Sequence, residues 1–99
     1  MWHMARLKDK VTVITGASSG IGRAIALAYA REGARVVVNY NRTKDRAQDV
    51  VSEIQGFSGQ AVAIQADIAD PGAVAGLLDT STSEFGRIDV WVNLSLIHI

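Results

Sequence analysis

The stretch that decides the fold of this chain covers residues 15 to 22 and has the sequence Thr15-Gly16-Ala17-Ser18-Ser19-Gly20-Ile21-Gly22. It follows the apolar run 11–14 and opens a helical pattern formed by Ile21, Ala24, Ile25 and Ala28. This order predicts a strand, a glycine-rich turn and a helix. The unpaired N–H groups at the start of such a helix, with the positive end of its dipole, favour a phosphate. Glycines allow the unusual backbone angles of the turn and the close approach of a pyrophosphate. The stretch therefore predicts a dinucleotide-binding turn.

The composition is that of one small domain. The chain has 99 residues, of which 10 are basic and 10 acidic, and 48% are hydrophobic. With this balance of charge, the sequence shows no excess of basic residues that would attract nucleic acid or an anionic membrane. No apolar run approaches the ~20 residues of a membrane span, and residues 1–4 lack the apolar core of a signal peptide. Cysteine is absent, which excludes disulfides and a thiolate metal site. We expect a cytoplasmic protein with no metal site and no nucleic-acid or membrane partner.

Strand-like and helix-like segments alternate along the chain. The pattern predicts strands at 11–15, 35–40, 60–66 and 88–93, and helices at 19–32, 43–54 and 71–85. Asp70 is expected to cap the last helix, ahead of a proline in its first turn. The expected buried stripe of that helix consists of Val74, Leu77, Leu78 and Phe85. Strands separated by helices pair in parallel through right-handed crossovers. The sequence therefore predicts an α/β fold, a truncated Rossmann-like doubly wound parallel sheet with strand order 3-2-1-4.

Three further features give this pattern a family resemblance. The spacing of Gly16, Gly20 and Gly22, the pair Asp67-Ile68 and the run from Phe85 to Asn93 resemble the N-terminal half of the short-chain dehydrogenase/reductase family. Within that family the chain looks similar to 3-oxoacyl-carrier-protein reductases and glucose dehydrogenases. The resemblance implies a parent oxidoreductase, expected to be a homo-oligomer, that interconverts a small-molecule carbonyl and an alcohol by hydride transfer. The cofactor would carry the hydride and the protein would position it.

The resemblance also implies roles for individual residues. The cofactor phosphates and ribose would be lined by Gly16, Ser18, Ser19, Gly20, Ile21 and Gly22. Asp67 would accept a hydrogen bond from the adenine amino group, and Ile68 would adjoin the ring. The alternative for Asp67 is a cap on the following loop. Asn93 matches the first residue of the family's Asn-Asn-Ala-Gly motif, but the three positions after it hold Leu94, Ser95 and Leu96. This departure puts the cofactor loop after the fourth strand in doubt.

The end of the second expected strand bears on the choice of cofactor. An acidic residue there would bind the ribose 2′-hydroxyl and repel a 2′-phosphate. The chain instead has Asn39, Tyr40, Asn41 and Arg42. A neutral Asn39 removes the repulsion, and Arg42 supplies a planar, bidentate partner for phosphate. We therefore expect NADP(H) rather than NAD(H), with a merely solvated basic helix start as the alternative.

Tyr40 and Lys44 have the spacing of the family's catalytic Tyr-x-x-x-Lys pair. The family places that pair far downstream, on a helix and after a catalytic serine, whereas Tyr40 ends an expected strand. We therefore assign no catalytic residue, and we expect the 99-residue chain to be inactive. The alternatives to a cofactor-binding part of an enzyme are a non-catalytic fragment and a nucleotide-binding regulatory domain.

The last residues do not fit the pattern. Leu94-Ser95-Leu96-Ile97-His98-Ile99 is apolar where a functional loop should follow the strand. It also resembles the translated transposon-end adapter used in sequencing libraries. We expect a partial NAD(P)-binding Rossmann domain over residues 1–93 and an artefactual tail over 94–99, with a natural divergent terminus as the alternative.

Overall fold

The computed structural model describes residues 7–17 and 20–94. In this part of the chain, parallel strands form one sheet in the order β3-β2-β1-β4. The strands are β1 (Val11–Thr15), β2 (Arg35–Tyr40), β3 (Gln60–Gln65) and β4 (Val90–Asn93). The helices that connect them are α1 (Gly20–Arg31), α2 (Lys44–Gly56) and α3 (Pro71–Phe85). The predicted α/β fold, its Rossmann-like sheet and its strand order are confirmed.

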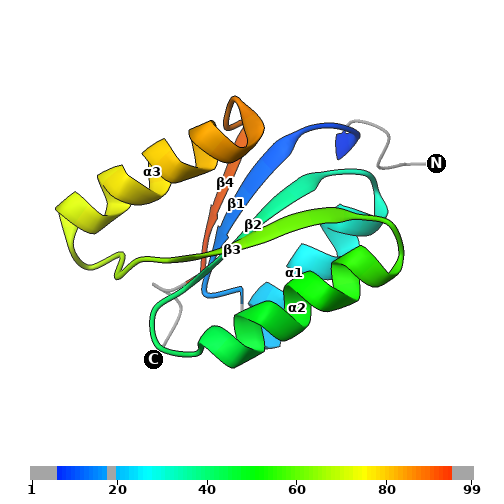
Figure 1. Cartoon of the computed structure of the whole chain (residues 1–99), viewed down its shortest axis with the longest axis horizontal. Helices are drawn as coiled ribbons and strands as arrows, with labels where there is room; N and C mark the ends of the chain where they lie inside the picture. The colour runs from blue at the N-terminus through cyan, green and yellow to red at the C-terminus, as the bar shows by residue number, and fades with distance from the viewer. Residues whose placement is uncertain (1–6, 18–19, 95–99) are drawn as a thin grey trace.

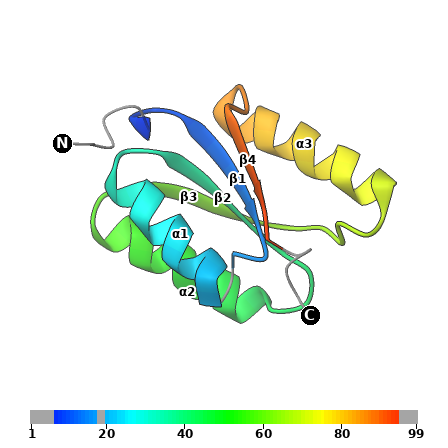
Figure 2. The same cartoon turned by 180° about the vertical axis from the view of Figure 1, so that it is seen from behind.

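The helices divide between the two faces of the sheet. Figures 1 and 2 show α1 and α2 side by side on one face and α3 alone on the other. The chain steps outward from β1 to β2 to β3 and then returns past β1 to place β4 at the opposite edge. Right-handed crossovers in opposite directions put their helices on opposite faces, which explains this division. No helix in the described residues is long and apolar enough to cross a membrane.

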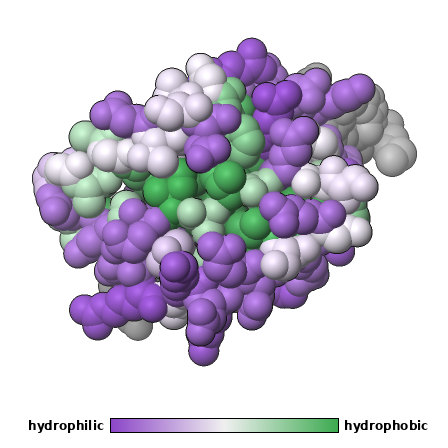
Figure 3. All heavy atoms as spheres, in the orientation of Figure 1, coloured by the Kyte–Doolittle hydropathy of each residue, from purple (hydrophilic) through white to green (hydrophobic). Residues whose placement is uncertain are grey.

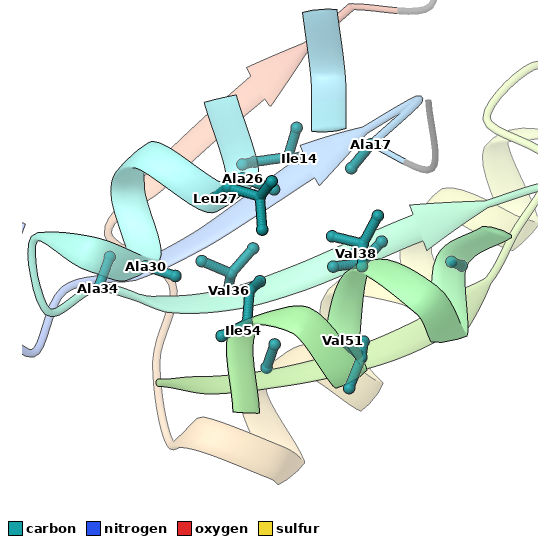
Figure 4. Packing of buried hydrophobic residues seen from close by; sticks show 13 residues of the cluster. Ile14, Ala17, Ala26, Leu27, Ala30, Ala34, Val36, Val38, Val51 and Ile54 are labelled. Carbon is teal, nitrogen blue, oxygen red and sulfur yellow. The ribbon is translucent and has the colours of Figure 1, made fainter. Parts of the chain in front are cut away.

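Both faces of the central strands are apolar, as expected of a parallel sheet that is covered on each side. Ile14, Val36 and Val38 point to the side of α1 and α2, where they pack in the larger core cluster shown in Figure 4. Val13 and Val37 alternate with them and pack with Leu77 on the side of α3. β1 and β2 therefore form the buried centre of the molecule, and the loops that follow them are anchored on a rigid base.

The face of α1 that packs on the sheet differs from the predicted pattern. Its buried residues are Gly22, Ala26, Leu27 and Ala30, whereas Ile21 is 70% exposed. Small residues at positions 22, 26 and 30 let the helix lie close to the sheet, which the larger Ile21 and Ile25 would prevent. Apolar residues occur all around this helix, so periodicity alone did not single out the packed face.

The last helix begins as predicted but buries fewer residues. The Asp70 side chain accepts a hydrogen bond from the N–H of Gly72 at the start of α3, and Gly86 ends the helix with φ +86°. Leu77 and Ser81 are buried, but Leu78 is 39% exposed, so its predicted burial is wrong. Leu78 follows Leu77 by about 100° around the helix and points away from the sheet.

Several predicted boundaries shift by one or two residues. α2 continues to Gly56, two residues beyond its predicted end, and β4 begins only at Val90. Leu94, the first residue of the expected tail, is half-buried and packs against the cluster on the side of α1. Residues 95–99 lie outside the described residues, so the artefactual tail stays a prediction.

Candidate functional site

The predicted site residues follow the carboxyl ends of the strands. Because the strands are parallel, the carboxyl ends of β1, β2, β3 and β4 lie at the same end of the sheet, as Figure 2 shows. Ligands of open α/β sheets bind at this end, where the strand order reverses. The reversal lies here between β1, whose crossover leads to β2, and β4 on its other side.

The turn after β1 requires glycine at defined positions. Gly16 and Gly20 have φ angles of +68° and +61°, which side chains rarely adopt. A Cβ on Gly22 would collide with the carbonyl oxygen of Gly16 and lie 2.8 Å from the Cα of Ala17. Gly22 thus packs the first turn of α1 directly on the turn that precedes it. Ser18 and Ser19, which belong to the predicted site, lie outside the described residues.

The start of α1 has the electrostatic character that an anion needs. The first N–H groups of a helix have no acceptor within the helix, and the dipole makes this end positive. The first turn of α1 contains no acidic residue that would compete for these groups. Ile21 is exposed beside them, so its side chain is available to cover a bound ligand.

Basic side chains gather after β2. Arg42, Thr43, Lys44, Asp45 and Arg46 line an open surface pocket of about 300 Å³. Arg42, Lys44 and Arg46 are exposed at the start of α2, where the helix dipole adds positive potential. This cluster can hold a phosphate through charge-assisted hydrogen bonds.

Asn39 has a different environment from the one that its predicted contact with the cofactor implies. Its side chain is 3% exposed, and the amide Nδ2 lies 3.1 Å from the carbonyl oxygen of Ile64 and 3.2 Å from that of Ala66. Its own carbonyl oxygen accepts a hydrogen bond from the N–H of Ala17 at 3.4 Å. The amide of Asn39 is therefore engaged with the neighbouring strand, whereas Asn41 and Arg42 are exposed.

Asp67 caps the loop after β3. Its Oδ1 accepts a hydrogen bond from the N–H of Ala69 at 3.0 Å, and its carbonyl oxygen accepts one from Asp70 at 3.0 Å. These bonds are the loop cap that we gave as the alternative. The residue is nevertheless exposed at the ligand end of the sheet, and a carboxylate can accept further hydrogen bonds. Ile68 is half-buried against the cluster on the side of α3.

Thr15 is a residue of the site that our sequence reasoning did not single out. Its side chain is fully buried, and Oγ1 lies 2.9 Å from Oδ1 of Asn93. The same oxygen accepts a hydrogen bond from the N–H of Leu94 at 3.1 Å. Thr15 therefore joins the end of β1 to the end of β4 and orients Asn93. A hydroxyl at the last position of a buried strand, directly before the glycine turn, was the available signal.

Tyr40 and Lys44, which have the spacing of a Tyr-x-x-x-Lys pair, lie in different elements. Tyr40 is the last residue of β2 and packs against the cluster on the side of α1, whereas Lys44 is the first residue of α2. The two residues belong to different elements, so their spacing does not place them on one helix face. In the described residues, no group of three or more acidic, histidine or cysteine side chains is arranged to hold a metal ion.

Comparison with known proteins gives the family. The model of the short chain dehydrogenase family matches residues 10–95. The chain belongs to the short chain dehydrogenase family. An uncharacterized oxidoreductase of Methylorubrum extorquens is 47% identical over 95 residues, which are 96% of this chain and 38% of that protein. A 3-oxoacyl-[acyl-carrier-protein] reductase of a Synechocystis species is 47% identical over 90 residues, covering 91% of this chain and 36% of that protein.

A solved structure agrees with this membership. The crystal structure of a short chain dehydrogenase from Burkholderia cenocepacia in complex with NADP matches with a TM-score of 0.84 and 45% identity. The match covers 89% of this chain and 36% of that one. This short chain dehydrogenase chain therefore spans well under half the length of these relatives, and over the matched part it has the fold of the solved structure.

Proposed function

We propose that the chain forms the NADP(H)-binding part of a short chain dehydrogenase that interconverts a carbonyl and an alcohol. The observation that carries the proposal is the basic pocket at the start of α2, beside the glycine turn at the same end of the sheet. A cofactor with a 2′-phosphate needs positive charge at this place in addition to a pyrophosphate site. The NADP complex of the Burkholderia cenocepacia relative supports this choice.

The residues present fit such a cofactor. Gly16, Gly20 and the first turn of α1 would hold the pyrophosphate with backbone N–H groups. Arg42 would bind the 2′-phosphate, and Asp67 and Ile68 would receive the adenine. Asn93, held by Thr15 at the end of β4, would border the site on the other side. Ser18 and Ser19 are proposed to line the phosphates from the turn itself.

When bound, the nicotinamide cofactor supplies a hydride, and the residues of this chain would bind and orient it. A carbonyl reduction also needs a proton donor of suitable pKa near the substrate oxygen. We assign no residue of this chain to that role, because Tyr40 belongs to β2 and packs in the core cluster. We therefore expect the 99-residue polypeptide alone to show no turnover of NADP(H) on ketones or aldehydes.

The test is a calorimetric titration, with NADP⁺ and NAD⁺, of the whole enzyme that contains this sequence, before and after Arg42→Ala. A bidentate charged contact is worth about 1.5–3 kcal/mol, so the variant should weaken NADP⁺ by about tenfold or more. NAD⁺, which has no 2′-phosphate, should bind the variant and the wild type alike.

Arg31→Ala is the matched control. Arg31 is the last residue of α1, and its Cζ lies 5.2 Å from the centre of the Phe57 ring. This place is at the opposite end of the sheet from the basic pocket. This variant removes the same charge and should change the affinity for neither cofactor. Equal losses of NADP⁺ and NAD⁺ binding in Arg42→Ala would contradict the assignment of Arg42 to the 2′-phosphate.

A further inference from the structure

The carboxyl end of β3 has an unusual hydrogen-bond donor. In the parallel ladder, Tyr40 pairs with Gln65, and the carbonyl oxygen of Tyr40 accepts a hydrogen bond from the N–H of Ala66 at 2.9 Å. The next donor along β2 would be the N–H of Arg42, and its acceptor would be the carbonyl oxygen of Ala66. β2 ends at Tyr40, however, and the chain turns away toward the basic pocket. The Ala66 carbonyl is therefore left without its ladder partner.

The side chain of Asn39 fills this gap. Its Nδ2 lies 3.2 Å from the carbonyl oxygen of Ala66 and 3.1 Å from that of Ile64. An amide nitrogen has two hydrogens, so one side chain satisfies both acceptors. Within the described residues, Nδ2 meets carbonyl oxygens, the third being that of Tyr40 at 3.4 Å. This environment fixes the orientation of the amide, because the opposite one would place Oδ1 against carbonyl oxygens.

Asn39 also reaches the glycine turn through its main chain. The N–H of Ala17 donates to the carbonyl oxygen of Asn39 at 3.4 Å. One buried residue thus contacts both segments that the proposed function assigns to the cofactor, the turn after β1 and the loop that begins at Ala66. Asp67, the proposed adenine partner, follows Ala66 directly in the chain.

We infer that Asn39 is a positioning residue whose side-chain amide holds the loop that contains Asp67. This loop would bind the adenine of a cofactor with or without a 2′-phosphate, so Asn39 would support the binding of both. This inference rests on the proposed function for its ligand. The sequence alone made Asn39 a neutral neighbour of the ribose. The inference makes it instead the hydrogen-bond donor to two carbonyl oxygens of the neighbouring strand and its loop. An acidic residue at this position would present oxygen to two carbonyl oxygens in a buried environment, which is unfavourable. Asn39→Asp should therefore damage the site for both cofactors and should not convert its preference to NAD(H).

The test compares Asn39→Asp with Asn41→Asp at pH 8. Asn41 is exposed, and its oxygens accept from Gln65, which a carboxylate can also do. The first measurement is amide hydrogen exchange at Ala69 and Asp70, whose N–H groups bond to Asp67. Asn39→Asp should speed exchange there by about tenfold or more, as expected when a buried hydrogen bond is lost. Asn41→Asp should leave it unchanged.

The second measurement is binding of 5′-AMP and 2′,5′-ADP, which differ by the 2′-phosphate. Asn39→Asp should weaken both by about the same factor, roughly tenfold. Lowering the pH to 5 should restore most of the lost affinity relative to wild type at that pH. A buried carboxyl group facing carbonyl oxygens has a raised pKa, and its protonated form regains a donor. A variant that had simply lost its fold would not recover in this way.

The outcomes separate the two claims. Unchanged exchange at Ala69 and Asp70 in Asn39→Asp would overturn the positioning role. Loss of 2′,5′-ADP binding alone, with 5′-AMP unaffected, would also overturn it and make Asn39 a charge filter at the ribose. If the wild type binds neither nucleotide, the proposed function fails, while the exchange measurement still decides whether Asn39 holds the loop.

Discussion

Asp89 stabilises the fold at the end of the sheet remote from the candidate site. Its Oδ2 accepts hydrogen bonds from the N–H of Val11 at 2.8 Å and from Nε of Arg87 at 2.9 Å. The backbone donor at Val11 lowers the pKa of the Asp89 carboxyl below its usual value. Burial opposes this shift, and the charge and the hydrogen bond of Arg87 add to the lowering. One side chain thus ties the first residue of β1 to the segment that leads into β4.

This lowered pKa predicts a pH dependence of stability. The folded state favours the charged carboxylate, so Asp89 makes its full contribution to the free energy of unfolding above about pH 5. This contribution is lost as the pH falls below about 4, through the pKa of the folded state. An asparagine side chain at this position carries no charge, so it has no pH-dependent contribution to lose. Asp89→Asn should therefore be less stable than wild type at pH 7, and its free energy of unfolding should fall less between pH 5 and 3.

Urea denaturation at several pH values measures this difference. Asp79→Asn, an exposed change on α3, is the control and should keep the wild-type pH profile. Parallel profiles for wild type and Asp89→Asn would show that the bond to Val11 contributes nothing to stability.

At the level of single residues, the sequence predicted local interactions well and distant ones poorly. Asp70 was placed correctly because a cap depends on neighbours a few positions away. The buried amide of Asn39 bonds to carbonyl groups that are 25 and 27 positions away, and Thr15 bonds to Asn93 across 78 positions. A local sequence pattern cannot show hydrogen-bond partners at these separations. A polar residue inside a strand of valines was the only sign that such a partner exists.

Among the elements, α1 is the one whose position the glycine turn controls. Gly22→Ala places a Cβ against Gly16 and Ala17, so the helix must move away from the turn. Overpacking of this kind costs about 1–3 kcal/mol, and the displaced N–H groups would no longer meet the phosphate of the proposed cofactor. We expect a lower melting temperature and a loss of NADP⁺ affinity of about tenfold or more, since 1.4 kcal/mol corresponds to tenfold.

Gly76→Ala is the matched control for this helix substitution. Gly76 lies within α3, and a Cβ there would meet no heavy atom within 4 Å. Alanine should stabilise α3 by about 0.5–1 kcal/mol. Differential scanning calorimetry and nucleotide titration of both variants measure the contrast. A Gly22→Ala protein that melts and binds like wild type would remove Gly22 from the site.

The same helix shows why element faces are harder to predict than element order. Alternation of strands and helices fixed the topology, because right-handed crossovers leave few alternatives. The spacing of Ile21, Ala24, Ile25 and Ala28 did not mark the packed face of α1, because alanine and isoleucine occur all around the helix. Close approach to the sheet favoured a face with small residues. In α2, where charged residues cover the outer face, the apolar residues Ala47, Val50, Val51 and Ile54 form one buried stripe.

For the whole molecule, the two faces of the sheet are unequally covered. The cluster on the side of α1 and α2 contains most of the fully buried residues, whereas the side of α3 has four buried members. Val62, Ile64 and Ile68 on that side are half-buried. Figure 3 shows apolar residues at the surface between α3 and α2, surrounded by polar ones. Among the described residues, β4 is an edge strand that pairs with β1 alone, and Val90, Trp91 and Val92 are half-buried.

This asymmetry predicts that the 99-residue polypeptide folds poorly by itself. An apolar edge strand offers unpaired backbone groups to other chains, and a thinly covered face adds apolar surface. A chain of this size also buries only about 60–65% of its unfolded surface. We expect concentration-dependent association in sedimentation velocity, or a molten state with weak near-ultraviolet dichroism from Trp91. Trp2→Phe isolates the Trp91 signal, because the chain has only these two tryptophans. A monodisperse monomer with strong Trp91 dichroism and one cooperative thermal transition would contradict the prediction, since it would mean that α3 alone covers its face well enough for a stable fold.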